Sequence, residues 1–502
     1  MEADGLKPGL SFFDAATIVA GSMIGSGIFI VSADIARQVG SPAGLLGVWL
    51  VSGLMTIAGA LSYGELAGMM PQAGGQYVFL REAYGGLWAF CFGWTLLLVI
   101  QTGTIAAVAV AFGRFAGVIW PALGSRIFIG AGSIGLSGER AGAIAIIGLL
   151  TAVNLRGLNL GRIVQNLFTS AKVLSLLFII LLGCLIAPNP AAVSANFGSL
   201  REFTGPRGLS LGLIAAFGSA MVGALFSADA WANVTFVASE VRDPGRNLPR
   251  ALGVGTVLVI ILYLLSNLAY MFQLPVLGNS TGATGVSNAT IFSNGIAHAE
   301  SDRVATAAMT MVWGNPGALI TALLVIISTF GCANGLILTG ARVIYAMSRD
   351  RVFFRAAGRV NRYSVPAVAL IIQGCWASLL TLSGSYSQLL DYVIFAQLMF
   401  YVLTVGAVFV LRTKRPEVRR PYRAWGYPWV PAAYMAAAAA LMLVLLAMKP
   451  HYTLAGLLIA LSGIPLHWLA GPESSVHGDH EKRRVLLAVV GKWQKRLNGE
   501  RT

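Results

Sequence analysis

The stretch GSMIGSGIFI, residues 21–30, places three glycines and two serines inside the first apolar segment of the chain. In a helix interior, glycine costs about 1 kcal/mol relative to alanine. A break in a membrane helix also leaves backbone N–H and C=O groups without partners, so breaks persist only where they are buried or line a cavity. The stretch therefore predicts a helix that is interrupted at membrane depth.

The composition places the chain in a membrane. Of its 502 residues, 56% are hydrophobic and 11% are charged, whereas soluble proteins carry about 25% charged residues. The net charge of +15 comes with arginines and lysines clustered in alternate loops. That distribution is typical of membrane orientation, and it argues against a nucleic acid as partner.

Twelve apolar segments are long enough, at about 20 residues, to cross the hydrocarbon core. They predict an all-α integral membrane protein with helices at 12–39, 44–70, 86–118, 141–158, 162–187, 209–240, 250–273, 317–347, 366–383, 387–411, 428–448 and 452–470. The connection between the seventh and eighth segments holds AHAESDRVATAAM (297–309), which predicts a short helix over the outer face.

The positive-inside rule orients the chain, because the loops rich in arginine and lysine share a side with both ends. Residues 1–11 are then a cytoplasmic N-terminus and residues 471–502 a basic cytoplasmic tail, in an inner or plasma membrane. The tail is either solvated or bound to an anionic leaflet. A cytoplasmic charge network is expected around Glu65, Glu82, Glu240, Arg81, Arg246 and Arg349.

A second interruption lies in the sixth segment, where Ser227-Ala228-Asp229-Ala230 follows Gly218 and Gly223. Helices 1 and 6 would each begin a set of five helices. Transporters built from inverted repeats break their helices at matching positions. Close packing through small residues is the alternative for a single such stretch, but a matching pair favours two functional breaks.

The broken ends predict the ligand. N–H groups of Ser26, Gly27 and Ile28 start the second half of helix 1, where the helix dipole favours a carboxylate. Carbonyls of Phe226, Ser227 and Ala228 end the first half of helix 6 and favour an ammonium. The two together are complementary to an α-amino acid. Three further residues complete the expected substrate site or its surroundings: Ile24, Gly25 and Asp229.

Five stretches in order resemble the amino acid–polyamine–organocation superfamily, and within it the L-amino-acid transporter branch. They are GSMIGSGIFI (21–30), YGELAGMMPQAGGQYVFLREAYG (63–85), WANVTFVASEVRDPGRNLPRAL (231–252), FGCANGLILTGARVIYAMSRD (330–350) and RPEVRRPYRAWGYPWVP (415–431). The resemblance implies alternating access by a leucine-transporter-type 5+5 inverted repeat. Helices 1–5 (12–187) and 6–10 (209–411) would form the repeats, with peripheral helices 11–12 over 428–470.

The resemblance also implies a coupling role for Lys172 in helix 5, which would replace the sodium ion of sodium-coupled relatives. It would contact carbonyls near Gly21 and a partner near Ser328. A lysine that exchanges a proton would couple protons to the inner gate, and a permanently charged lysine would act as a brace. Phe226 resembles the aromatic gate of the branch, and Trp231 begins the second half of helix 6.

Asp229 allows several roles, because a carboxylate at the break can hold the substrate ammonium, select a cationic side chain, carry a proton, or cap the N–H groups of Trp231 and Ala232. Asn233 stands where several exchangers of the branch have tyrosine, which departs from the pattern of obligatory exchange. Around the cavity, polar residues of helices 3 and 8 are candidates to face the substrate: Gln101, Thr102, Thr104 and Asn334.

The expected function is secondary transport of L-amino acids, most simply neutral ones, by proton symport or by exchange. A carrier of cationic amino acids or polyamines that uses Asp229 is the alternative. No catalytic set or metal-spaced cluster is evident, so neither an enzyme nor a cofactor is expected, apart from a proton as coupling ion. Relatives that bind an ancillary glycoprotein do so through a cysteine between helices 3 and 4, and residues 119–140 contain none. No covalent partner is therefore expected.

Overall fold

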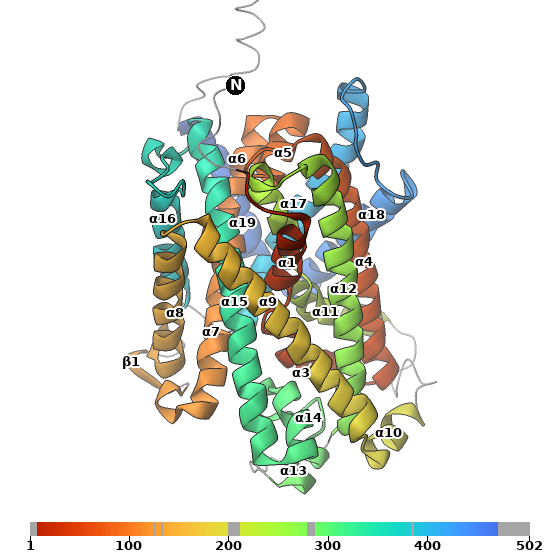
Figure 1. Cartoon of the computed structure of the whole chain (residues 1–502). Helices are drawn as coiled ribbons and strands as arrows, with labels where there is room; N and C mark the ends of the chain where they lie inside the picture. The colour runs from red at the N-terminus through yellow and green to blue at the C-terminus, as the bar shows by residue number, and fades with distance from the viewer. Residues whose placement is uncertain are drawn as a thin grey trace, which may run out of the picture.

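Most of the long helices run roughly parallel in one bundle, which α9 crosses obliquely (Figure 1). The computed structural model describes residues 8–124, 126–131, 134–198, 211–278, 287–382 and 386–469. Within them, ten helices are long and apolar enough to cross a membrane. Two shorter apolar helices, Ala367–Leu380 and Thr453–Trp468, lie where the ninth and twelfth crossings are expected. Ten of the twelve expected crossings are thus supported.

The membrane helices follow the expected order along the chain. They are α1 (Phe12–Met23), α2 (Gly27–Ile30), α3 (Ser32–Val39), α4 (Pro42–Met69), α6 (Gly86–Thr95), η1 (Leu96–Ile100), α7 (Gln101–Ile119), α8 (Gly138–Asn154), α9 (Leu158–Ile180), η3 (Leu181–Ile186), α11 (Leu211–Ser227), η5 (Trp231–Glu240), α12 (Pro244–Gln273), α15 (Asn315–Arg349), α16 (Ala367–Leu380), α17 (Tyr386–Lys414), α18 (Trp429–Met448) and α19 (Pro450–Leu469). The predicted tail, 471–502, lies outside the described residues, as do residues 1–7 of the predicted N-terminus.

Both predicted breaks are present. The first segment ends as a helix at Met23, passes through an extended Ile24 (φ −72°, ψ 90°), and resumes at Gly27. In the sixth segment, α11 ends at Ser227 and Ala230 takes a left-handed conformation (φ 66°) before η5 begins. Unlike the α-helix that the sequence suggests, η5 is a 3₁₀-helix with a kink at Val237. A long 3₁₀ stretch is uncommon and often marks a hinge.

Local sequence explains where the first helices begin and end. The Ser11 hydroxyl accepts a hydrogen bond from the Asp14 N–H, and the Asp14 carboxylate accepts one from the Ser11 N–H. This capping box satisfies two N–H groups that the helix leaves unpaired. Gly40 ends α3 in a left-handed conformation (φ 64°), and Ser41 with Pro42 starts α4 at once.

The elements outside the membrane correct several expectations. The hairpin β1 (Ile127–Ala131) and β2 (Ile134–Ser137) joins α7 to α8, where no strand is expected. The helix expected over 297–309 begins later, as α14 (Val304–Trp313). Shorter helices that the sequence analysis misses are α5 (Gln76–Tyr84), α10 (Pro190–Phe197) and α13 (Asn288–Asn294). Figure 1 shows α13 and α14 at one end of the bundle and α5 at the other.

Ion pairs close the end of the bundle that carries α5. Glu65 pairs with Arg412 and with Arg420, and the fully buried Arg342 pairs with Glu240 at 3.0 Å. Further pairs at this end are Arg81–Asp350 and Arg415–Glu82. A charge network around the three predicted glutamates therefore exists. Apart from Arg81, however, these pairs use arginines that the sequence analysis does not name.

The N-terminal segment makes backbone hydrogen bonds at the same end of the bundle. The N–H groups of Gly9 and Leu10 donate to the Glu240 carbonyl at 2.8 and 2.9 Å, and the Arg242 N–H donates to the Leu10 carbonyl. The chain just before α1 is thus tied to the end of η5. Separation of α1 from η5 at this end would break these hydrogen bonds.

Candidate functional site

The two helix breaks face each other across one small cavity. Its lining residues are Ser22, Met23, Gly25, Ser26 and Gly27 of the first break, Phe226, Ser227, Asp229 and Ala230 of the second, Thr104 and Val108 of α7, and Cys332 of α15. The cavity volume is about 10 Å³, which is about what one water molecule needs. In this arrangement the breaks are closed on each other.

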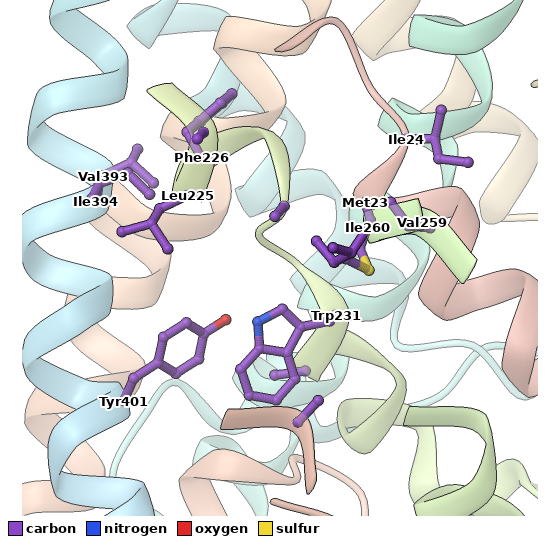
Figure 2. Close-up of a cluster of buried hydrophobic side chains, with 14 of the residues drawn as sticks. Met23, Ile24, Leu225, Phe226, Trp231, Val259, Ile260, Val393, Ile394 and Tyr401 are labelled. Atoms are coloured by element: carbon purple, nitrogen blue, oxygen red, sulfur yellow. The ribbon is translucent and has the colours of Figure 1, made fainter. Parts of the chain in front are cut away.

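Six of the nine predicted substrate-site residues line this cavity: Gly25, Ser26, Gly27, Phe226, Ser227 and Asp229. The other three, Ile24, Ile28 and Ala228, are buried nearby but are not among its lining residues. Figure 2 shows Met23 and Ile24 of the first break and, from the second, Leu225, Phe226 and Trp231.

The absence of a side chain at Gly27 lets the two breaks meet. A Cβ atom added there would lie 2.7 Å from Ser227 Cβ and 2.9 Å from Ser227 Cα, and would overlap the Ser227 hydroxyl. Real Cβ atoms do not approach so closely. Gly25 is also confined, since a Cβ there would lie 3.1 Å from the Cys332 sulfur.

The Asp229 carboxylate is buried and accepts a hydrogen bond from the Tyr401 hydroxyl at 2.7 Å. The Ala230 backbone N–H is a second donor to it. Among the described residues, no hydrogen bond joins this carboxylate to the N–H groups of Trp231 or Ala232, so the predicted cap of η5 is not formed. The Tyr401 ring stacks on Trp231, with centroids 5.0 Å apart (Figure 2).

Asp229 also borders a second cavity, on the side of α17. The lining residues of this cavity are Thr56, Leu225, Asp229, Trp231, Ile394, Gln397, Leu398, Tyr401 and Tyr434. The Gln397 side chain is 4% exposed, and its Oε1 atom has no hydrogen-bond partner among the described residues. A buried amide oxygen without a donor costs about 1–3 kcal/mol. This cavity therefore presents two acceptors, the Asp229 carboxylate and the Gln397 oxygen.

Lys172 lies where α9 packs between α1 and α15, and its side chain is fully buried. Its ammonium donates a hydrogen bond to the Gly21 carbonyl at 2.6 Å. On α15 it lies against Gly331, where an added Cβ would lie 3.0 Å from Lys172 Cε. The ammonium of Lys172, from α9, thus holds the end of α1 just before the first break.

The predicted contact of Lys172 on helix 8 is a partner near Ser328, and Lys172 lies against Gly331, three residues further along α15. The Ser328 hydroxyl itself lies 3.1 Å from the Gly25 carbonyl and 3.4 Å from that of Ile24. One turn further along α15, the Cys332 thiol donates to the Ser22 carbonyl at 3.1 Å. Helix α15 therefore supplies donors to the last turn of α1, at Ser22, and to the break itself, at Gly25, while Lys172 of α9 donates to Gly21.

The polar candidates of helices 3 and 8 separate into two groups. Thr104 lines the cavity between the breaks. Asn334 points away from it and shares hydrogen bonds with Asn154 of α8 and Gln165 of α9. Gln101 donates to the Leu336 carbonyl, and its oxygen lies 3.5 Å from the Asn233 amide nitrogen. The Thr102 hydroxyl donates to the Leu97 carbonyl of η1, which directly precedes α7.

Sequence analysis misses two tyrosines that complete the site. Tyr401 reaches Asp229 from α17, and Tyr263 of α12 reaches both breaks, with its hydroxyl 2.8 Å from the Met23 carbonyl and 2.9 Å from the Ser227 carbonyl. Each lies in a long apolar helix that carries several other hydroxyl side chains. Nothing in the spacing indicates which of many apolar faces it joins.

Comparison with known proteins identifies the family. The model of the amino acid permease family matches residues 10–461. The b(0,+)-type amino acid transporter 1 of Homo sapiens is 29% identical over 419 residues, which cover 83% of this chain and 79% of that protein.

Two further relatives cover more of the chain. The serine/threonine exchanger SteT of Bacillus subtilis is 29% identical over 470 residues, covering 93% of this chain and 98% of its own. The large neutral amino acids transporter small subunit 2 of Homo sapiens is 30% identical over 467 residues, covering 92% of this chain and 80% of its own. These relatives are transporters and not enzymes. The chain is a multi-pass membrane protein that belongs to the amino acid permease family of the amino acid–polyamine–organocation superfamily.

Proposed function

We propose that the protein is a secondary transporter that carries L-amino acids across the plasma membrane by alternating access. The substrate carboxylate binds the N–H groups of Ser26, Gly27 and Ile28, where α2 begins and continues through Val31 into α3. The ammonium binds the carbonyls of Phe226 and Ser227 at the end of α11. The fold is taken as two inverted five-helix repeats with two peripheral helices and both termini in the cytoplasm.

The observation that carries this proposal is the single cavity shared by the two breaks. A helix N-terminus favours an anion and a helix C-terminus favours a cation, and here one of each borders the same space. Because that space has room for about one water molecule, an amino acid enters only if the breaks move apart. A site that must open to admit an amino acid, and that is closed in the arrangement seen here, is consistent with alternating access.

We infer that substrates include neutral amino acids. The relatives are named for serine and threonine and for large neutral amino acids. Lys172 is proposed as the coupling group, through its bond to the Gly21 carbonyl at the end of α1. Coupling takes the form of proton symport or of amino acid exchange. The lack of cysteine in 119–140 supports function without a covalently attached subunit.

Uptake of radiolabelled amino acids into proteoliposomes tests the proposal. A panel of L-serine, L-leucine and L-arginine is offered outside, with and without the same amino acid inside, and with and without an inward proton gradient. Uptake into vesicles without internal amino acid, driven by the gradient, indicates symport. Uptake only against internal amino acid indicates exchange. Absence of uptake in every arrangement contradicts the proposal.

A second candidate substrate class is favoured by the cavity beside Asp229. Two buried acceptors, the Asp229 carboxylate and the unpaired Gln397 Oε1, border it. A side chain that ends in an ammonium or guanidinium would donate to both. We infer that cationic amino acids are carried as well if this cavity receives the substrate side chain.

Asp229→Asn tests this assignment. Hydrogen bonds to charged groups contribute about 1.5–3 kcal/mol, so we expect arginine uptake to fall at least about tenfold. Leucine uptake, measured in the same vesicles, should change less than about threefold, because an apolar side chain gains nothing from the carboxylate. Gln397→Leu should act in the same direction with a smaller effect.

Gln76→Leu is the matched control for Gln397→Leu. Gln76 is also a buried glutamine whose Oε1 atom lacks a hydrogen-bond partner among the described residues, but it lies outside both cavities. It should leave the arginine-to-leucine ratio unchanged. Equal losses of arginine and leucine uptake in Asp229→Asn would mean that Asp229 only supports the break.

A further inference from the structure

A groove of about 510 Å³ lies away from both helix breaks, on the side of the bundle where α8 packs against α16. Both helices lie along the left edge of the bundle in Figure 1. The volume falls within the range of about 300–1,000 Å³ that is typical of small-molecule sites. The lining residues are Ile144, Ile147, Gly148, Thr151, Ala152, Leu155, Ile371, Gly374, Cys375, Ser378, Leu379 and Leu382.

Small residues on both helices make this groove. Each helix contributes two small residues that are four positions apart and therefore share a face: Gly148 and Ala152 in α8, and Gly374 and Ser378 in α16. A Cβ atom added at Gly148 would meet no atom within 4 Å. Leu379, which also lines the groove, is 56% exposed. The groove therefore opens on the surface that faces lipid.

An apolar groove does not by itself select one lipid from a bilayer. An acyl chain that enters it gains no hydrophobic free energy, because the surrounding lipid chains are equally apolar. Preference for one lipid over another must come from polar or charged groups at an end of the groove.

Exposed arginines stand at the Leu155 end of the groove. The Asn361 side-chain amide donates to the Leu155 carbonyl at 2.8 Å, which ties the loop before α16 to the end of α8. The next residue after each of these two, Arg156 and Arg362, is exposed, and neither forms an ion pair with a described residue. At the opposite end, the Leu382 carbonyl accepts a hydrogen bond from the hairpin.

The charge at the Leu155 end suits an anion. Residues 351–365 hold four arginines and no acidic residue. Arginine binds phosphate through two parallel N–H groups, and basic pockets between membrane helices bind the headgroups of anionic lipids. The end of the groove therefore supplies the selection that its apolar walls lack.

We propose that the groove between α8 and α16 binds an anionic phospholipid, with one acyl chain along the groove and the phosphate at Arg156 and Arg362. The proposal does not depend on which solute the protein carries. The small-residue faces would also admit a membrane helix from a second copy of the chain. The exposed arginines favour the lipid, because its phosphate pairs with them.

Native mass spectrometry of the purified protein, titrated with dioleoyl phosphatidylglycerol or dioleoyl phosphatidylcholine, tests the headgroup. Each arginine near the membrane surface adds attraction for an anionic lipid, so we expect a Kd about 10- to 30-fold lower for phosphatidylglycerol. Arg156→Gln/Arg362→Gln should remove that preference. Arg246→Gln/Arg250→Gln removes the same charge from exposed arginines of α12 and should keep it. Equal Kd values for the two lipids in the wild type, or equal effects of the two double variants, would overturn the proposal.

Gly148→Leu tests the groove without removing charge. The leucine side chain has room in the folded protein but occupies the space of the acyl chain, so tight phosphatidylglycerol binding should be lost. Gly253→Leu is its control, because a Cβ added at Gly253 of α12 meets only Leu61, at 3.7 Å. Unchanged lipid binding in Gly148→Leu, or displacement of the lipid by an equal concentration of inorganic phosphate, would reduce the site to a surface anion site and overturn the proposal. A dimer that Gly148→Leu dissociates would assign the groove to a second copy and would overturn it as well.

Discussion

Lys172→Met is expected to abolish most transport, lowering amino acid uptake about 10- to 150-fold. Methionine keeps much of the side-chain volume but removes the donor to the Gly21 carbonyl. That carbonyl lies near the end of α1, just before the first break. Without the lysine donor, the end of α1 is no longer held to α9, and we expect the opening and closing of the first break to be impaired. Initial uptake rates in proteoliposomes, normalised to the amount of folded protein, measure the effect.

Thermal unfolding of the same variant separates function from stability. Burying an ammonium is costly, and replacing a buried charge by an apolar group is often neutral or stabilising. We therefore expect Lys172→Met to unfold at a temperature no lower than the wild type. Lys414→Ala is the control, because Lys414 also donates to a backbone carbonyl, that of Ala83, but at the end of the bundle. Uptake by Lys172→Met within a few-fold of the control would contradict a coupling role.

Gly27→Ala is the second substitution with a large expected effect. The added methyl group would lie within 3 Å of three Ser227 atoms, including the backbone Cα. Overpacking of this kind typically costs 1–3 kcal/mol and occasionally more, and here it acts on the surface where the two breaks close. We expect uptake to fall about 5- to 150-fold, with the unfolding temperature also lowered.

Gly148→Ala is the control for this substitution. Gly148 lies in α8, and a Cβ added there meets no atom within 4 Å among the described residues. Its replacement should leave uptake unchanged and raise stability slightly, since alanine favours the helix by about 1 kcal/mol. If Gly27→Ala transports as well as Gly148→Ala, the two breaks do not need to approach each other during the cycle.

The breaks were predictable because they follow from backbone chemistry. Glycines 21, 25 and 27 weaken a helix at membrane depth, and only a buried or cavity-lining position tolerates that. The second break has fewer glycines close to it, but the charged Asp229 within an apolar segment indicates its position. Lys172 stands out for the same reason, since a charged residue deep in an apolar helix demands a partner.

Contacts between distant helices were not predictable in the same way. Whether Tyr263 reaches the two carbonyls depends on the rotation of α12 about its axis, which hydropathy does not define in a helix that is apolar on many faces. Asn334 was misplaced for this reason and lies with Asn154 and Gln165 instead of at the cavity. The 3₁₀ form of η5 was not predictable either, because WANVTFVASE does not by itself exclude an α-helix.

The measurement that tests the account most directly is an experimental structure of the wild-type protein with a transported L-amino acid bound. The account predicts that its carboxylate lies at the N–H groups of Ser26, Gly27 and Ile28 and its ammonium at the carbonyls of Phe226 and Ser227, with the two breaks further apart than they are here. An amino acid bound away from both breaks, or bound with its carboxylate and ammonium exchanged, would contradict it.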